Sequence, residues 1–225
     1  MLIMKLSGYE TIFDVSPWLN AVNSDNCYDY AIGDYETFRN VKSTPGDRAH
    51  MSPMNLNVSS CSQIRKRILA DNPKTVYLCK DPNKVCRRGY YKIMSFVNSK
   101  GADFHFYKQV RGVKYKIKTG DTVASLSNFF RVTPTTIKNC GNLTPGRTIT
   151  FPCNLWAHKR GWGDLPIMTD ASGKTIKDPR RANRRYPGLD YDRFCGAMCV
   201  KTNRAGSGYP SLKGLRALNR ARPRL

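Results

Sequence analysis

The chain has 225 residues, 40% of them hydrophobic and 11% aromatic, and a net charge of +22 from 38 Lys and Arg against 16 Asp and Glu. This length suits one or two domains, and the apolar content excludes disorder for most of the chain. The positive charge argues against a neutral cytosolic metabolic enzyme and favours anionic partners: nucleic acid non-specifically, an anionic membrane surface or an acidic protein.

The amino terminus shows no targeting signal. Its apolar run, residues 1–4, is far shorter than the roughly 7 to 15 residues of a signal-peptide core. No stretch approaches the ~18 apolar residues of a membrane span. We therefore expect synthesis in the cytosol and no membrane span.

The chain has eight cysteines. Because disulfides are rare in reducing compartments, we expect these cysteines to be free or metal-bound thiols. The spacings contain no Cys-x-x-Cys pair and the chain has three His, so we expect neither a metal site nor another cofactor. The cysteines are Cys27, Cys61, Cys79, Cys86, Cys140, Cys153, Cys195 and Cys199.

The first predicted helix starts at a cysteine. Residues 26–31 read Asn-Cys-Tyr-Asp-Tyr-Ala, and either Asp25 or Asn26 can cap the helix. Because a helix amino terminus lowers the pKa of a thiol, we expect Cys27 to favour the thiolate. A Pro-Gly-Asp turn follows at residues 45–47.

Two strands and a turn come next. Residues 89–97 and 102–110 are rich in aromatic and β-branched side chains and flank a turn at residues 98–101, and His105 lies on the second strand. A further strand at residues 155–158 carries His158.

Between these strands, residues 115–152 predict a β-α-α-β unit. Alternation at residues 115–118 indicates a strand, and the spacing of Val123, Leu126, Phe129 and Phe130 indicates a helix. Thr-Pro at 133–134 starts a second helix that ends near Asn139, and residues 148–151 form the closing strand.

This unit resembles a LysM module. The resemblance rests on Gly-Asp-Thr at 120–122, Asn139, Asn-Leu at 142–143 and the stretch from Pro-Gly at 145–146 to Pro152. It implies binding of N-acetylglucosamine polymers such as chitin or peptidoglycan in a groove between two loops. The implied glycan-binding residues are Gly120, Asp121, Thr122, Val123, Asn142, Leu143, Thr144, Pro145 and Gly146. The glycines, Asp121 and Pro145 are also turn residues, which a copy with an inactive groove would keep.

Removing residues 111–153 would leave a closed hairpin, and insertions are best tolerated at hairpin tips. We therefore predict an α+β fold. Residues 1–110 and 154–200 form one small discontinuous host domain, residues 111–153 are the inserted module, and residues 201–225 are a basic arm.

The host domain resembles papain-like hydrolases of the NlpC and CHAP types, through the Cys that opens a helix, the Pro-Gly-Asp turn and the His residues on two following strands. The resemblance implies Cys27 as nucleophile, His105 as its base and His158 as the group that orients the base. The chain departs from these families in the bulky sequence Asp-Phe-His-Phe-Tyr around His105. The alternative is that His105 covers an aromatic sheet face and Cys27 is a small buried residue, which would make the scaffold inactive.

The arm has seven basic residues and no acidic one, and Leu212, Leu215 and Leu218 recur at helical spacing. It is predicted to bind anionic groups of a partner. The arginines assigned to this role are Arg216, Arg220, Arg222 and Arg224.

Three function classes follow. The one we expect is a minor structural, capsid-associated protein of a large virus particle, made in the host cytoplasm, which binds glycan and contacts other structural proteins. It is favoured by the expected cytosolic synthesis and by a resemblance of residues 165–200 to proteins of bacteria and of large algal DNA viruses. The alternatives are a secreted or wall-bound cysteine hydrolase, a peptidase or amidase anchored by its LysM module, and a nucleic-acid packaging protein.

Overall fold

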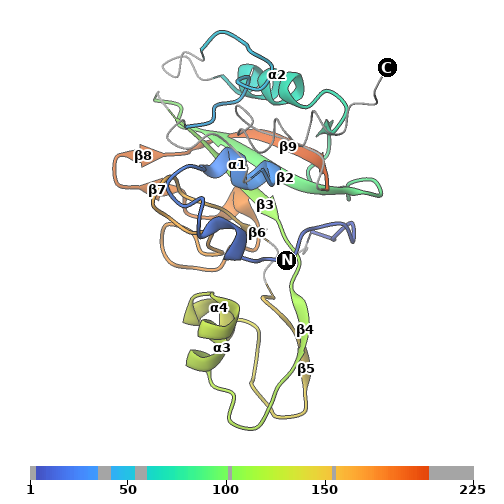
Figure 1. The fold of residues 1–225 in the computed structure, drawn as a ribbon, viewed down its shortest axis with the longest axis vertical. Coiled ribbons are helices and arrows are strands. Elements are labelled where there is room, and N and C mark those ends of the chain that lie inside the picture. The colour runs from blue at the N-terminus through green and yellow to red at the C-terminus, as the bar shows by residue number, and fades with distance from the viewer. Residues whose placement is uncertain (1–3, 35–41, 54–59, 101–102, 154–155, 203–225) are drawn as a thin grey trace.

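The computed structural model describes residues 4–34, 42–53, 60–100, 103–153 and 156–202. Figure 1 shows two parts of the molecule, a larger body and a smaller unit that lies below it in this view. The predicted partner-binding residues Arg216, Arg220, Arg222 and Arg224 lie outside the described residues.

The body is built on an antiparallel five-stranded sheet with strand order β1-β9-β2-β3-β6. Every residue of β2 and β3 is buried, so both faces of the central sheet are covered. The hairpin predicted from residues 89–110 is therefore confirmed as β2 paired with β3. The strands are β1 (Val76–Cys79), β2 (Tyr90–Val97), β3 (Phe104–Gln109), β6 (Trp156–Ala157) and β9 (Arg193–Lys201).

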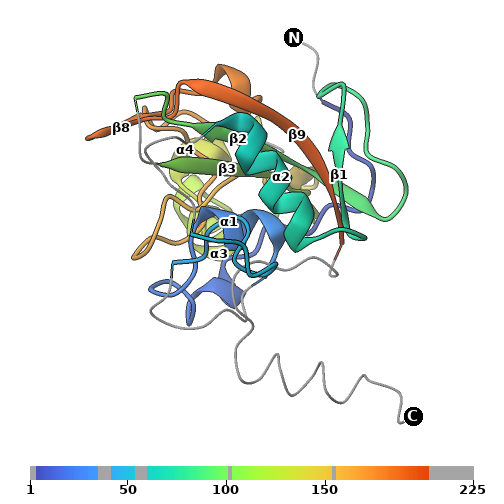
Figure 2. The ribbon, with the colours of Figure 1, turned by 90° about the horizontal axis from the view of Figure 1, so that it is seen from above.

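Two helices cover one face of this sheet, α1 (Cys27–Ile32) and α2 (Cys61–Asp71), with α2 lying along β9 (Figure 2). Asn26 begins α1 through a capping box with Asp29, and Ser60 caps α2, so short polar side chains fix both starts. The core on this face joins α1 and α2 to β2, β3 and β9.

The opposite face is covered by a hairpin of β7 (Arg185–Tyr186) and β8 (Leu189–Asp190) and by Met4 and Ile176. Two short 3-10 helices, η1 (Ser16–Trp18) and η3 (Pro179–Arg181), complete the body. Trp18 belongs to a third apolar cluster, which also contains Val110 and Ala157, at the end of the sheet nearest the smaller unit.

The smaller unit, here called the lower unit, consists of β4 (Val113–Lys116), α3 (Val123–Phe130), α4 (Pro134–Lys138) and β5 (Thr148–Phe151). β4 and β5 pair antiparallel, so the predicted β-α-α-β order and strand pairing are confirmed. Thr122 caps α3 and Thr133 caps α4. Its own small core comprises Ile117, Leu126, Ile137, Ile149 and Phe151.

The lower unit interrupts the sheet of the body. β3 precedes it and pairs with β6, which follows it, through Lys108 opposite Ala157. The unit also contacts the body through Asn139, whose Nδ2 donates to Thr175 Oγ1 at 2.8 Å. The fold class predicted, α+β, is confirmed, whereas the papain-like and LysM identities and the domain boundaries stay predictions.

The cysteines contradict the sequence-based interpretation. Six of them form disulfides, Cys61–Cys195, Cys86–Cys199 and Cys140–Cys153, and only Cys27 and Cys79 are free. The prediction of free or metal-bound thiols is wrong for these six. β9 returns beside segments 134 and 113 residues earlier in the chain and supplies one cysteine to each of two pairs, and the pairing of β4 with β5 brings Cys153 back to Cys140. Within the described ranges, no cluster of three His, Cys, Asp or Glu side chains could hold a metal ion. Of the helices in these ranges, none has the length and apolar character to cross a membrane.

Candidate functional site

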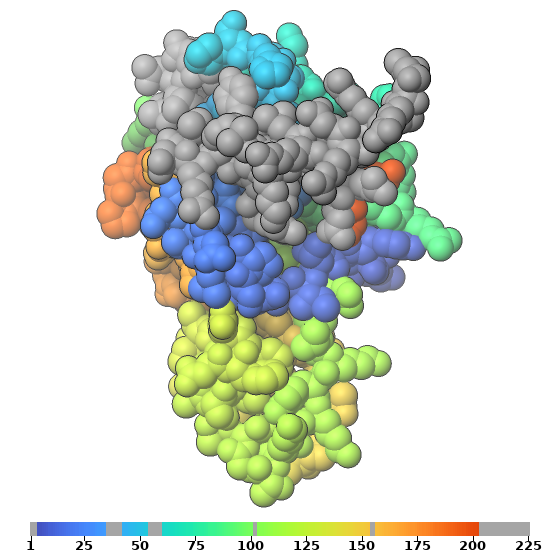
Figure 3. Space-filling view, viewed as in Figure 1, coloured from blue at the N-terminus to red at the C-terminus, as the bar shows by residue number. Residues whose placement is uncertain are grey.

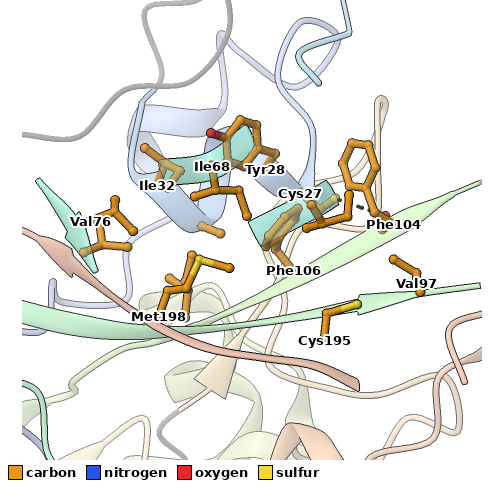
Figure 4. Packing of buried hydrophobic residues seen from close by; sticks show 14 of the residues in the cluster. Cys27, Tyr28, Ile32, Ile68, Val76, Val97, Phe104, Phe106, Cys195 and Met198 are labelled. Atoms are coloured by element: carbon orange, nitrogen blue, oxygen red, sulfur yellow. Dashed lines mark hydrogen bonds between the residues drawn. The ribbon is translucent and has the colours of Figure 1, made fainter. Parts of the chain in front are cut away.

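Cys27 is the first residue of α1, and its side chain is 4% exposed. It packs with Phe104 and Phe106 of β3, and its Sγ donates to the carbonyl oxygen of Phe104 at 3.6 Å (Figure 4). The thiol therefore lies against the backbone of the strand that carries His105.

Burial, together with the negative charge of Asp103, raises the pKa of the Cys27 thiol to about 12. The expected thiolate is therefore wrong for this structure. Helix α1 has only six residues, and its amino-terminal dipole does not offset the loss of hydration around a buried thiolate. At neutral pH the group is a protonated thiol.

The two predicted histidines do meet. His105 Nε2 lies 2.7 Å from His158 Nδ1, and His158 Nε2 lies 2.8 Å from the carbonyl oxygen of Thr169. A carbonyl oxygen can only accept, so His158 carries its proton on Nε2 and accepts at Nδ1 from His105 Nε2. Both rings are buried and neutral, since burial lowers the pKa of His158 to about 4 and that of His105 well below its usual value.

This arrangement leaves His105 Nδ1 as a buried acceptor without a hydrogen-bond partner among the described residues. An imidazole held through one nitrogen, with a lone pair on the other, is the arrangement that a general base requires. The geometry of the two rings therefore fits the roles predicted for His105 as base and His158 as orienting group, and no proton donor to His105 Nδ1 lies among the described residues.

Cys27 and His105 face different sides of β3. Phe104 and Phe106 belong to the core under α1, whereas the His105 ring contacts Tyr107, Tyr191 and His158 on the opposite side. Alternation of side chains along a strand explains this separation. The structure therefore joins two of the three predicted catalytic residues by a hydrogen bond, and makes no such bond between the thiol and His105.

Tyr191 is a member of this cluster that sequence analysis missed. Its ring stacks on His105 with centroids 4.9 Å apart, and its hydroxyl donates to Asp103 Oδ2 at 2.9 Å. No local pattern at residues 189–192 distinguishes this tyrosine, because its partner strand is more than 80 residues away in sequence.

The predicted glycan-binding loops lie side by side at the end of the lower unit farthest from the body (Figures 1 and 3). Ile117 N donates to Arg147 O, and Gly146 N donates to Ile117 O, both at 2.9 Å. These two bonds extend the β4–β5 pairing and bring the turn at residues 118–121 next to the turn at residues 144–147.

The two loops differ in whether their polar side chains form hydrogen bonds within the protein. Asp121 accepts from Lys118 N at 2.7 Å, and Thr122 is engaged in the cap of α3. By contrast, Asn142 and Thr144 are exposed, and their side chains make no hydrogen bond within the described ranges. The second loop therefore offers free donors and acceptors to a ligand.

Three buried lysines also escaped sequence analysis: Lys92 in β2, Lys108 in β3 and Lys159, two residues after the end of β6. The sequence did hold a signal for them, namely a lysine within an otherwise apolar or aromatic strand. A buried lysine must either find a polar partner for its charge or lose its proton, so such a position indicates an unusual environment.

Compared with protein-family models, with curated proteins and with solved structures, the chain gives no match.

Proposed function

We propose that the protein is a non-enzymatic, glycan-binding structural protein whose lower unit binds N-acetylglucosamine polymers. The observation that carries this proposal is the pair of loops at residues 120–123 and 142–146, held side by side by the bonds of Ile117 at the exposed tip of the unit. Such a polymer lies along a surface, so a tip that projects from the body suits it.

The body supports binding rather than catalysis. Its candidate nucleophile is a buried thiol whose pKa lies near 12, and it makes no hydrogen bond to the candidate base. By contrast, the loops of the lower unit are open to solvent. Of the predicted sites that fall within the described residues, the loop pair is therefore the one with accessible polar groups.

The proposal includes assembly of the protein into a larger particle. A net charge of +22 favours assembly with anionic neighbours, which suits a component of a large particle such as a virus capsid. Three disulfides brace the part of the chain that the structure describes, and such bracing suits a protein that must persist in an assembly.

The test is a titration of the full-length protein with chitin hexasaccharide, followed by amide NMR signals. We expect saturable shifts at residues 118–123 and 142–147. Thr144→Ala should weaken binding about 3- to 10-fold, the value of one hydrogen bond. The control Thr135→Ala, also exposed but on α4, should bind as the parent chain does. No saturable shift at millimolar sugar, or equal weakening by both variants, contradicts the proposal.

A second function, cysteine hydrolysis, is favoured by one observation, the unpaired Nδ1 of His105 with its ring oriented by His158 and Thr169. It requires a rearrangement, because Cys27 and His105 lie on different sides of β3 in this structure. Under this alternative, Cys27 would become alkylated by iodoacetamide in the folded protein, and His105→Gln would slow that reaction. If Cys27 reacts only after denaturation, the hydrolase alternative fails and the glycan-binding proposal is unaffected.

A further inference from the structure

Lys108 has a different environment from the other two buried lysines. The ammonium of Lys92 donates to the carbonyl oxygens of Pro82 and Lys84. Lys159 donates to the carbonyls of Val22, Asp25 and Gly161. Both nitrogens therefore have backbone carbonyl oxygens as hydrogen-bond acceptors, which gives these two lysines a structural role.

Lys108 is 4% exposed, and among the described residues its Nζ contacts the faces of two aromatic rings. Its Nζ lies 5.4 Å from the centre of the Tyr30 ring and 4.8 Å from that of Tyr91. Among the described residues no hydrogen bond or ion pair reaches this nitrogen. Burial without a polar partner lowers the pKa of Lys108 to about 7, so about half of the groups are neutral amines at pH 7.

A small pocket opens onto this amine. It has a volume of about 110 Å³, close to that of four water molecules, and both Lys108 and Tyr91 line it. Apolar walls are provided by Ile12, Pro17, Trp18 and Ile32.

Gly33 keeps the approach to the nitrogen open. A Cβ at this position would lie 3.2 Å from Lys108 Nζ, and the backbone of Gly33 has a φ of +81° as the carboxyl-terminal cap of α1. The positive φ favours glycine at this helix end, and a methyl group at the same position would lie in close contact with the amine.

We propose that Lys108 is a covalent binding site for a small aldehyde or ketone. The amine lone pair attacks the carbonyl carbon and forms a C–N bond, and a proton moves from nitrogen to oxygen to give a carbinolamine. Loss of water then gives the imine. The step needs no oxidant or reductant, and the product is a neutral or protonated imine in a pocket that holds only a few non-hydrogen atoms.

The groups around Lys108 Nζ favour a neutral carbonyl compound over an anion as the ligand. The titratable groups that face the amine are the phenols of Tyr30 and Tyr91 and, in the pocket wall, the carboxylate of Asp14. Burial raises the pKa of both phenols, so they are neutral at pH 7, and Asp14 would repel an anionic ligand.

The experiment treats the full-length folded protein with acetaldehyde and sodium cyanoborohydride at pH 7, and maps ethylated lysines by mass spectrometry. We expect Lys108 to react at least about 10-fold faster than the exposed Lys114, because far more of it is unprotonated. Lys92 and Lys159, buried but hydrogen-bonded, serve as internal controls and should stay unmodified. Lys108 labelling no faster than that of Lys114, or only in urea, overturns the proposal.

Two further experiments test whether the pocket limits the size of the ligand. Pyridoxal, which is too large for the pocket, should label exposed lysines but not Lys108. Gly33→Ala places a methyl group against Nζ and should slow ethylation of Lys108 several-fold, with tryptophan fluorescence used to verify that the body is folded. Labelling of Lys108 by pyridoxal as fast as by acetaldehyde would contradict a size-limited site.

Discussion

The body and the lower unit differ in how far apart in sequence their stabilising contacts lie. In the body, β2 pairs with β9 and two disulfides join residues 134 and 113 positions apart. In the lower unit, all four elements fall between residues 113 and 151, and its disulfide closes 13 residues. The lower unit is therefore held by local contacts and the body by distant ones.

This difference suggests that the two parts unfold separately. They have separate cores, joined through Val132, which packs at the edge of both clusters, and through the bond from Asn139 to Thr175. All three tryptophans, Trp18, Trp156 and Trp162, lie in the body, so tryptophan fluorescence reports the body alone.

The largest effect is expected from the disulfides. Replacing Cys61 and Cys195 together by alanine should lower the free energy of unfolding of the body by about 5 kcal/mol, because a long loop of the unfolded chain is released. The same change at Cys140 and Cys153 should cost the lower unit about 3 kcal/mol. Urea unfolding followed by fluorescence should detect the first loss and not the second. A shared loss would show that the two parts unfold together.

Core truncation gives the next largest effect. Phe106→Ala removes a fully buried ring and should destabilise the body by about 3–5 kcal/mol. Ile137→Ala should cost about 2–5 kcal/mol in the lower unit alone. Hydrogen exchange should then speed up across residues 113–151 while the fluorescence midpoint stays unchanged. A lower midpoint in Ile137→Ala would indicate that the body depends on the lower unit.

The stability of the body and that of the lower unit should also differ in their dependence on pH. His158 is neutral when folded, with a pKa of about 4, while an unfolded histidine titrates near 6.5. Between these values the unfolded chain binds a proton that the folded chain does not, so the body loses stability as pH falls, by about 3 kcal/mol at pH 4. Urea midpoints measured from pH 7 to 4.5 check this, and His158→Gln should flatten the curve.

The lower unit is the internal control for this effect, because residues 111–153 contain no histidine. NMR signals of the Ile137 and Ile149 methyl groups should therefore report a stability that is insensitive to pH between 6.5 and 5. If the two parts lose stability in parallel over this range, buried histidine is not the cause.

The smallest effect is expected at the contact between the parts. Asn139→Ala removes one neutral hydrogen bond to Thr175 and should cost about 0.5–1.5 kcal/mol. Because Asn139 also follows α4 directly, Thr175→Val tests the same bond from the body side. Equal small losses in both variants would locate the coupling in this bond, whereas a loss only in Asn139→Ala would locate it in the end of α4.

The sequence by itself determined the elements whose causes are local. The spacing from Val123 to Phe130, the caps at Thr122 and Thr133 and the start at Pro134 act within a few residues, and the lower unit follows them. The β2–β3 hairpin was predictable for the same reason, since its strands are adjacent in the chain.

Only the tertiary structure decided the properties that depend on burial or on distant partners. Whether Cys27 is a thiolate depends on its desolvation beside Phe104, and the bond between His105 and His158 depends on β6 returning to β3 after the lower unit. The disulfide partners and the unpaired amine of Lys108 follow from strand order in the sheet. Each of these is a free-energy balance set by neighbours many residues away, and residue spacing along the chain does not contain that information.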